Sequence, residues 1–160
     1  AEEVCMEPVR QHHNAFQVTG LTVRTTNLEE SCPKTARIGA LWGRFFGEQL
    51  REHTPERTAD PRNFGVYSAY ASDADGAFDV TAGVAVAHAG AAVEVQAGDY
   101  LVWTGSGDMP HTVVSLWQAA WAYFGAHPEI RRRYVSDFEA YTSPTEVALC
   151  IGVAPVGHAA

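Results

Sequence analysis

The feature that most constrains the fold is an internal repeat, because one order of elements, strand, helix, strand, strand, occurs twice. Runs rich in Val, Thr and aromatic residues between turn residues predict the strands. Apolar residues at the spacing of one helical face predict the helices. The first copy comprises residues 15–25, 31–53, 63–71 and 77–87, and the second comprises residues 92–105, 106–127, 134–141 and 145–154. Residues 92–105 fit either a strand or a short hairpin.

Short sequence matches accompany the repeat. "LWGRFF" in the first helix corresponds to "LWQAAWAYF" in the second, "VYSAY" to "DFEAY", and "VTAGVAV" to "LCIGVAP". A helix with one apolar stripe can cover a sheet with one apolar face, so each copy can bury its own helix. We therefore expect an α+β fold with a pseudo-twofold axis, in which two helices pack on antiparallel sheets. A central ligand groove is expected between the copies, since small-molecule sites favour such clefts.

The expected domain organisation follows from the repeat. Residues 1–14 are interpreted as an irregular N-terminal segment, and residues 154–160 as a C-terminal tail. Residues 15–153 form a single domain, with a first unit at about 15–88 and a second at about 92–153. In the first helix, Ser31 or Thr35 is expected to act as the N-cap, and Gln49 interrupts the apolar stripe.

The charge balance excludes some partners. The formal net charge is −8, and Lys34 is the single lysine, whereas a nucleic-acid-binding surface needs a basic face. We expect no direct contact with nucleic acid and none with a membrane, because no long apolar run is present. The three cysteines show no pairing pattern, which favours a cytoplasmic, reducing environment.

The sequence offers little support for a cofactor, a metal or acyl-transfer chemistry. There is no GxSxG motif, no cysteine beside an activating histidine and no metal-ligand spacing. We expect no cofactor, no metal and no firmly assignable catalytic residue. The "DADG" stretch at 73–76 is interpreted as a hairpin turn. The basic run 131–133 is interpreted as a complement to the negative end of the preceding helix.

The stretch "YVSDFEAY", residues 134–141, contains the main candidate residue. Alternation along a strand places Asp137, Glu139 and Tyr141 on one face and the apolar residues on the other. By itself this pattern favours a solvated face, but it also fits a carboxylate held in a pocket. In the first copy, the repeat aligns Ser68 with Glu139, so the two copies differ at this position.

Aromatic residues provide the candidate walls. Tyr67 and Tyr70 are three positions apart on a predicted strand, so one is expected in the groove and the other in the core. Trp42 and Trp117 lie within apolar helical stripes, for which core packing is the more general interpretation. The candidate residues for ligand binding are Glu139, Tyr141, Tyr67, Tyr70, Trp103, Trp117 and Trp121, with Trp103 expected at the rim.

The blocks "VTGLTVRTTN", "ARIGALWGRFF", "FGVYSAYASDADGAFDVTAGVAV", "QAGDYLVWTGSGDMP" and "EVALCIGV" resemble the GyrI-like effector-binding family. The likeness extends over about residues 15–153 and includes integron-cassette proteins and ligand-binding domains of multidrug-responsive transcription activators. It implies the duplicated fold and a groove for lipophilic, often cationic, compounds. It also implies that Glu139 lines that groove with Tyr141 beside it.

The resemblance leaves three functions open. The first is binding of lipophilic cations for sensing or sequestration, without a DNA-binding helix-turn-helix. The second is hydrolysis of cyclopropane-bearing genotoxic compounds, with Glu139 as acid or base. The third is interaction with a protein partner such as gyrase. A homodimer formed through an exposed sheet edge is a further possibility.

Overall fold

The computed structural model describes residues 2–88 and 93–156, so residue 92 of the expected second unit and residues 157–160 of the expected tail lie outside the described residues. The strands are β1 (Glu3–Val4), β2 (Val9–His13), β3 (Phe16–Thr25), β4 (Asn63–Ser68), β5 (Phe78–Val86), β6 (Val93–Val95), β7 (Gly98–Ser106), β8 (Arg132–Ser143) and β9 (Glu146–Val153). The helices are α1 (Asn27–Glu30), α2 (Ile38–Gly47), α3 (Leu50–His53) and α4 (His111–Ala126).

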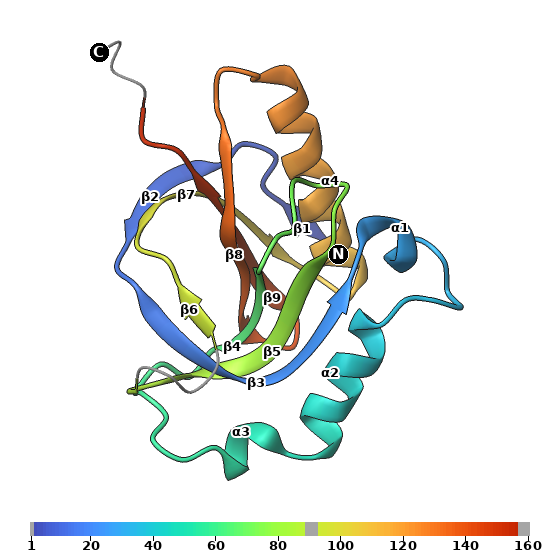
Figure 1. The fold of residues 1–160 in the computed structure, drawn as a ribbon, viewed down its shortest axis with the longest axis vertical. Helices are drawn as coiled ribbons and strands as arrows, with labels where there is room; N and C mark the ends of the chain where they lie inside the picture. Colours follow the sequence, from blue (N-terminus) through green and yellow to red (C-terminus); the bar gives the residue numbers. More distant parts are fainter. Residues whose placement is uncertain (1, 89–92, 157–160) are drawn as a thin grey trace.

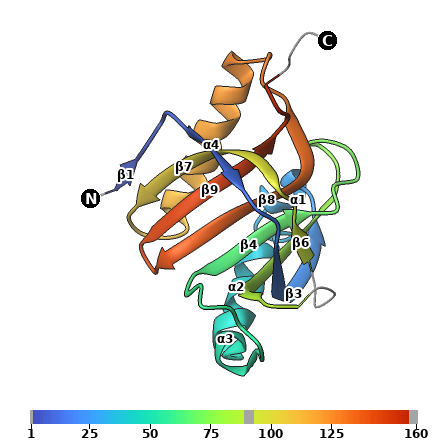
Figure 2. The ribbon, with the colours of Figure 1, turned by 90° about the vertical axis from the view of Figure 1, so that its left-hand side faces the viewer.

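The described strands form one antiparallel sheet that reflects the sequence repeat. Its order is β1-β7-β9-β8-β4-β5-β3-β6, and β2 also pairs with β7. The order β4-β5-β3 in the first copy mirrors β8-β9-β7 in the second, and the copies join where β4 pairs with β8 (Figure 2). The predicted α+β fold with two helices on antiparallel strands is confirmed.

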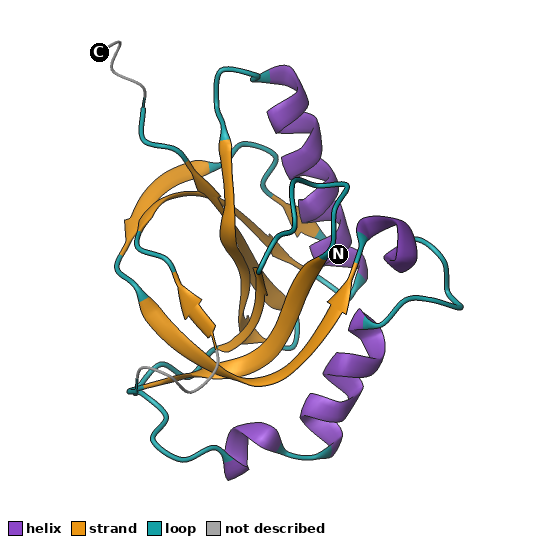
Figure 3. Ribbon diagram, in the orientation of Figure 1, coloured by secondary structure: helices purple, strands orange, loops and turns teal. Residues whose placement is uncertain are grey.

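The curled sheet has two differently covered faces (Figure 1). Inside the curl, one core cluster contains Phe64, Val66 and Phe138. On the other face α4 packs over β7 and β9, and α2 packs over β3 and β5. Figure 3 shows both of these helices on the same side of the sheet. This arrangement places one helix on each side of the junction of the copies, on the same face of the sheet.

The N-terminal segment is not irregular, in contrast to the expectation. β2 pairs with β7 from Val9 opposite Val102 to His13 opposite Gly98, and β1 pairs with the other end of β7. The side chains of β2 are largely exposed, so no apolar alternation marks this strand in the sequence. Main-chain hydrogen bonding to the edge of β7 creates it instead.

The first predicted helix, 31–53, is shorter and broken. Neither Ser31 nor Thr35 caps α2, because the Glu30 carboxylate accepts hydrogen bonds from the main-chain N–H groups of Arg37 (2.8 Å) and Ile38 (3.2 Å). The helix ends before Gln49, whose φ of 50° is left-handed and separates α2 from α3. None of the helices in the described part of the chain is long and apolar enough to cross a membrane.

Candidate ligand-binding pocket

A cavity of about 860 Å³ lies between α2 and α4, with β4 and β8 beneath it. Because β4 pairs with β8, the cavity spans the junction of the two repeat copies, where the groove was predicted. Its volume suits a drug-sized organic molecule. Its lining is rich in aromatic and apolar side chains, among them Ile38, Trp42, Phe46, Tyr67, Tyr70, Phe78, Met109, Val113, Trp117, Trp121 and Tyr141.

A second hollow, of about 740 Å³, lies where β1 meets the ends of β7 and β9. Its charged lining consists of Glu2, Glu3 and Glu146, and no aromatic residue is among the described residues that line it. No group of His, Cys, Asp and Glu able to hold a metal occurs in residues 2–88 and 93–156. The cavity between the helices is therefore the stronger candidate site.

Two acids, Glu30 and Glu139, line this cavity, and Glu139 is the more buried of them, at only 3% exposed. Its Oε2 accepts hydrogen bonds from the Tyr67 hydroxyl (2.8 Å) and the Trp117 indole N–H (2.7 Å). Its Oε1 accepts one from the Tyr141 hydroxyl (2.8 Å). In the described ranges, no Arg, Lys or His forms a hydrogen bond or ion pair with this carboxylate. Glu139 is thus a buried acid held by neutral donors and lacking a counterion.

Burial controls the protonation of this cluster. Desolvation raises the pKa of Glu139 because it penalises the carboxylate, and the hydrogen bonds from Trp117, Tyr141 and Tyr67 oppose this effect without cancelling it. The pKa values of Tyr67 and Tyr141 are raised as well, first by burial and next by the nearby charge of Glu139. These tyrosines therefore remain neutral donors at physiological pH.

Asp137 lies two residues earlier on the same face of β8 and has a counterion. The Arg132 Nη2 donates to Asp137 Oδ2 at 2.8 Å, and the two side chains are 7% and 0% exposed. The Tyr70 hydroxyl also donates to Oδ2, and the main-chain N–H of Gly152 donates to Oδ1 at 2.8 Å. The charge of Asp137 is therefore balanced, whereas that of Glu139 is not.

Aromatic rings surround Glu139. Tyr67 and Trp117 pack edge to face with centroids 5.0 Å apart, and Trp42 and Tyr141 do so at 5.3 Å. Trp121 extends this wall from Trp117, at 5.9 Å between centroids. Trp121 is 46% exposed, which places it at the mouth of the cavity. The lining around Glu139 thus combines a buried carboxylate with several π faces.

Tyr67 and Tyr70 both line the cavity, although alternation predicted that only one would. The strand ends at Ser68, and Ala69 has a left-handed φ of 51°. This change of backbone direction ends the alternation before Tyr70. Tyr70 then hydrogen-bonds to Asp137 while Tyr67 hydrogen-bonds to Glu139.

Trp103 does not line the cavity, so its predicted rim position is wrong. Its side chain is 0% exposed and packs beneath α4 against Tyr123 (5.7 Å) and Phe124 (5.9 Å). The prediction assumed a strand that ends near Trp103, but β7 continues to Ser106. Trp103 therefore lies in the middle of a strand on the face that α4 covers.

The alignment of Ser68 with Glu139 is wrong, because the two side chains lie on opposite faces of the sheet. The ladder places Gly65 opposite Glu139, Tyr67 opposite Asp137 and Ser68 opposite Ser136. Directly paired residues share a face, so Ser68 lies on the face inside the curl, away from the cavity. In β4, Asn63, Gly65 and Tyr67 are the residues that share the outer face with Glu139.

Trp42 and Arg132 are two of the lining residues that were not among the sequence candidates for binding. Trp42 was interpreted as core, yet it packs against α2 neighbours and lines the cavity as well. Arg132 was interpreted as a complement to a helix end, but α4 ends at Ala126 and Arg132 opens β8. The contact between Arg132 and Asp137 could not be predicted from strand alternation, because the pairing of β8 with β9 shifts register between these two residues.

Solved structures share this fold. An integron cassette protein from the mobile metagenome of Vibrio cholerae is 36% identical, with a TM-score of 0.78 over 92% of this chain and 96% of that one. A protein solved with tetraphenylphosphonium bound is 16% identical, with a TM-score of 0.74 over 96% of this chain and 98% of that one. A protein of Staphylococcus aureus described as a bacterial transcription regulation protein is 16% identical, with a TM-score of 0.73 over 94% and 100% of the two chains.

Residues 11–153 match the family of integron-associated effector binding proteins. With this match over most of its length, the chain belongs to that family. No curated protein matches the chain. The resemblance to GyrI-like effector-binding proteins is confirmed at the level of family and fold.

Proposed function

We propose that this protein binds lipophilic organic cations in the cavity between α2 and α4, for sensing or sequestration. The observation that carries the proposal is the environment of Glu139, a buried carboxylate with three neutral donors and no counterion. Burying such a charge unpaired is unfavourable, so a cation that reaches it removes that penalty. A neutral ligand of the same shape does not.

The aromatic lining supports the same ligand class. A cation near the face of Trp or Tyr gains about 0.5–2 kcal/mol, with the larger value when water is excluded. Tyr67, Trp117 and Tyr141 all contact the carboxylate and line the cavity, so the charge and the π faces act at one place. That a structure of the same fold holds tetraphenylphosphonium gives independent support.

The experiment compares matched cationic and neutral ligands. Methyltriphenylphosphonium and neutral triphenylphosphine oxide are titrated against the tryptophan fluorescence of the parent chain and of Glu139→Gln. We expect the phosphonium to bind the parent more tightly and to lose roughly 30-fold in Glu139→Gln, because truncating one partner of a buried charge pair costs about 2 kcal/mol or more. The phosphine oxide should bind both proteins within about twofold.

Glu129→Gln is the matched control, because the same change is made at an exposed site beyond α4. It should leave both affinities unchanged. Equal binding of the cation and the oxide by the parent, or an unchanged phosphonium affinity in Glu139→Gln, would refute the proposal.

A further inference from the structure

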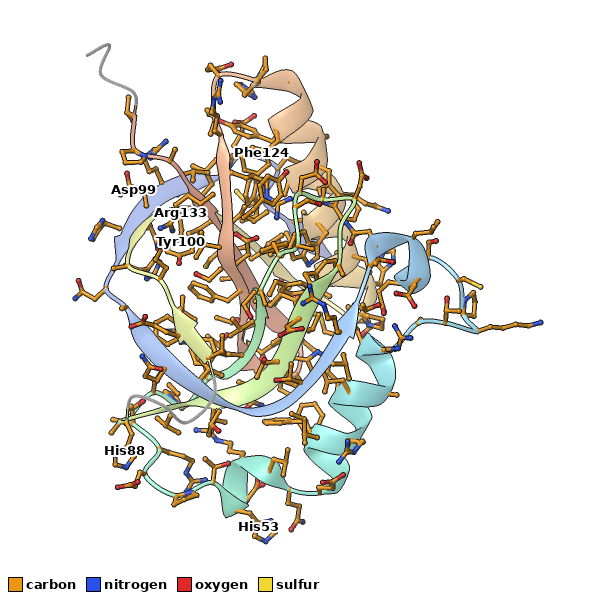
Figure 4. The ribbon with its side chains drawn as sticks, in the orientation of Figure 1. His53, His88, Asp99, Tyr100, Phe124 and Arg133 are labelled. Carbon is orange, nitrogen blue, oxygen red and sulfur yellow. The ribbon has the colours of Figure 1, made fainter. Side chains whose placement is uncertain are left out.

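Arg132 and Arg133 are neighbours at the start of β8 that point to opposite faces of the sheet. Figure 4 shows Arg133 beside Tyr100, and the Arg133 guanidinium lies 4.9 Å from the centroid of that ring. Arg132 instead lies on the side of α4, with its guanidinium 6.0 Å from the ring of Phe124. Arg132 lines the cavity that contains Glu139, whereas Arg133 does not.

Arg132 keeps most of its hydrogen-bonding capacity unused. A guanidinium carries five N–H donors. Within the described residues, the recorded acceptor is Asp137 Oδ2, bound through Nη2, and the buried Nε has no acceptor. The side chain is 7% exposed, and its guanidinium stacks on Tyr134 at 4.4 Å. A fixed, desolvated donor with free N–H groups at a cavity wall is a binding group for an acceptor atom.

The charges decide what kind of acceptor fits. Asp137 already balances the positive charge of Arg132, and Glu139 adds a further negative group on the same face. A ligand carboxylate would meet two acids and one cation, so it is disfavoured. A neutral carbonyl or ester oxygen can accept an N–H bond from Arg132 without adding charge.

We propose that Arg132 is a second polar anchor of the cavity, and that the preferred ligands are lipophilic cations that also carry a neutral carbonyl or ester oxygen. This inference rests on the proposed function, because it takes Glu139 as the partner of the cation. Asp137 and Glu139 are two residues apart on one strand, so the cation and the acceptor are expected to lie about 7 Å apart.

The test uses three triphenylphosphonium probes that differ in one chain. The first carries a heptyl chain, the second an ethyl butanoate chain of equal length, and the third the free butanoate. Each is titrated calorimetrically against the parent chain, Arg132→Met/Asp137→Asn and Glu139→Gln. The double substitution removes the guanidinium without leaving Asp137 as an unpaired buried charge, and Asn can still accept the N–H of Gly152.

We expect the ester probe, relative to the heptyl probe, to lose about tenfold in affinity between the parent and the double variant, since a hydrogen bond to a charged donor contributes about this much. The butanoate probe should bind the parent more weakly than the ester. Circular dichroism checks that the variant is folded. If the double variant is not folded, the same ratio of ester to heptyl affinity is measured in Arg132→Lys. This variant retains a positive charge beside Asp137 but lacks the planar guanidinium, so the ratio should fall there as well.

The two proposals fail in different ways. The role of Arg132 is overturned if the ratio of the affinities of the ester and heptyl probes is the same in the parent and the double variant. It is also overturned if the butanoate probe binds the parent as tightly as the ester probe does. In that case tight phosphonium binding that is lost in Glu139→Gln still supports the proposed function. Failure of Glu139→Gln to weaken the heptyl probe overturns the proposed function itself.

Discussion

Asp137 and Glu139 lie on the same face of β8, two residues apart, and are both almost completely buried. Asp137 receives a guanidinium and a main-chain N–H, whereas Glu139 receives only hydroxyl and indole donors. The same residue class in the same strand therefore has two different electrostatic roles. Asp137 links β8 to β9 by accepting a hydrogen bond from the main-chain N–H of Gly152, whereas Glu139 places a carboxylate in the wall of the cavity.

The raised pKa of Glu139 predicts how stability depends on pH. Below the pKa of an unfolded glutamate, about 4.3, the side chain is protonated in both states. As the pH rises from there through the raised folded pKa, the unfolded state loses this proton first, so the free energy of unfolding falls.

The same pKa predicts proton-linked binding. A cation stabilises the carboxylate, so its affinity should increase as the pH rises through the folded pKa of Glu139 and then level off. Tyr67 and Tyr141, which face the carboxylate, stay neutral in this range, and Arg132 stays paired with Asp137. Calorimetry of methyltriphenylphosphonium in two buffers of different ionisation enthalpy, at a series of pH values above the pKa of an unfolded glutamate, should show proton release on binding until the pH exceeds the raised folded pKa of Glu139. In Glu139→Gln, both the pH dependence and the proton release should vanish; their persistence would assign the linkage to another group.

At the scale of elements, the pairing of β4 with β8 shapes the floor of the cavity. Gly65 lies directly opposite Glu139 in this ladder. A Cβ added at Gly65 would lie 3.1 Å from Glu139 Oε1 and 3.1 Å from Trp42 Cζ2. The lack of a side chain at this position thus leaves room for both the carboxylate and the tryptophan.

Gly65→Ala should therefore weaken cation binding more than it weakens the fold. Either the carboxylate or Trp42 must move by a few tenths of an ångström, and we expect the phosphonium affinity to fall about tenfold. Gly43→Ala is the matched control, because nothing lies within 4 Å of a Cβ at that exposed position in α2. It should leave binding unchanged and raise the free energy of unfolding by up to about 1 kcal/mol. Unchanged binding in Gly65→Ala would show that this close packing is not needed.

At the scale of the whole molecule, the cavity joins the two repeat copies. Tyr67 from the first copy and Trp117, Glu139 and Tyr141 from the second are linked by hydrogen bonds across the β4–β8 junction. A ligand in contact with this cluster is in contact with both copies. Its binding free energy should therefore stabilise the molecule as one cooperative unit rather than one copy alone.

Thermal unfolding can test this coupling. At a phosphonium concentration of about 100 times Kd, the free energy of unfolding should rise by about 2.7 kcal/mol. We expect circular dichroism of the helices and tryptophan fluorescence to report a single transition whose Tm rises together with ligand concentration. Two transitions, of which only one responds to the ligand, would show that the copies unfold independently.

The sequence by itself determined the elements and the frame of the site. Period-two and helical spacings reflect which side chains are buried, so they located six strand segments and the helices α2 and α4, together with the shared face of Asp137, Glu139 and Tyr141; the segment 92–105 contains both β6 and β7. The repeat predicted a groove between the copies, because each copy can bury its own helix and leave the junction open.

Only the tertiary structure decided which of the two acids, Asp137 or Glu139, has a counterion. Arg132 pairs with Asp137 because β8 is irregular between them, and regular strand alternation in the sequence does not predict that irregularity. It also decided the position of Trp103 under α4, the turn at Ala69 that brings Tyr70 to the cavity, and the strand β2. These features depend on main-chain pairing, left-handed φ values and strand register. Such properties belong to contacts between distant segments, and a local pattern of side chains does not contain them.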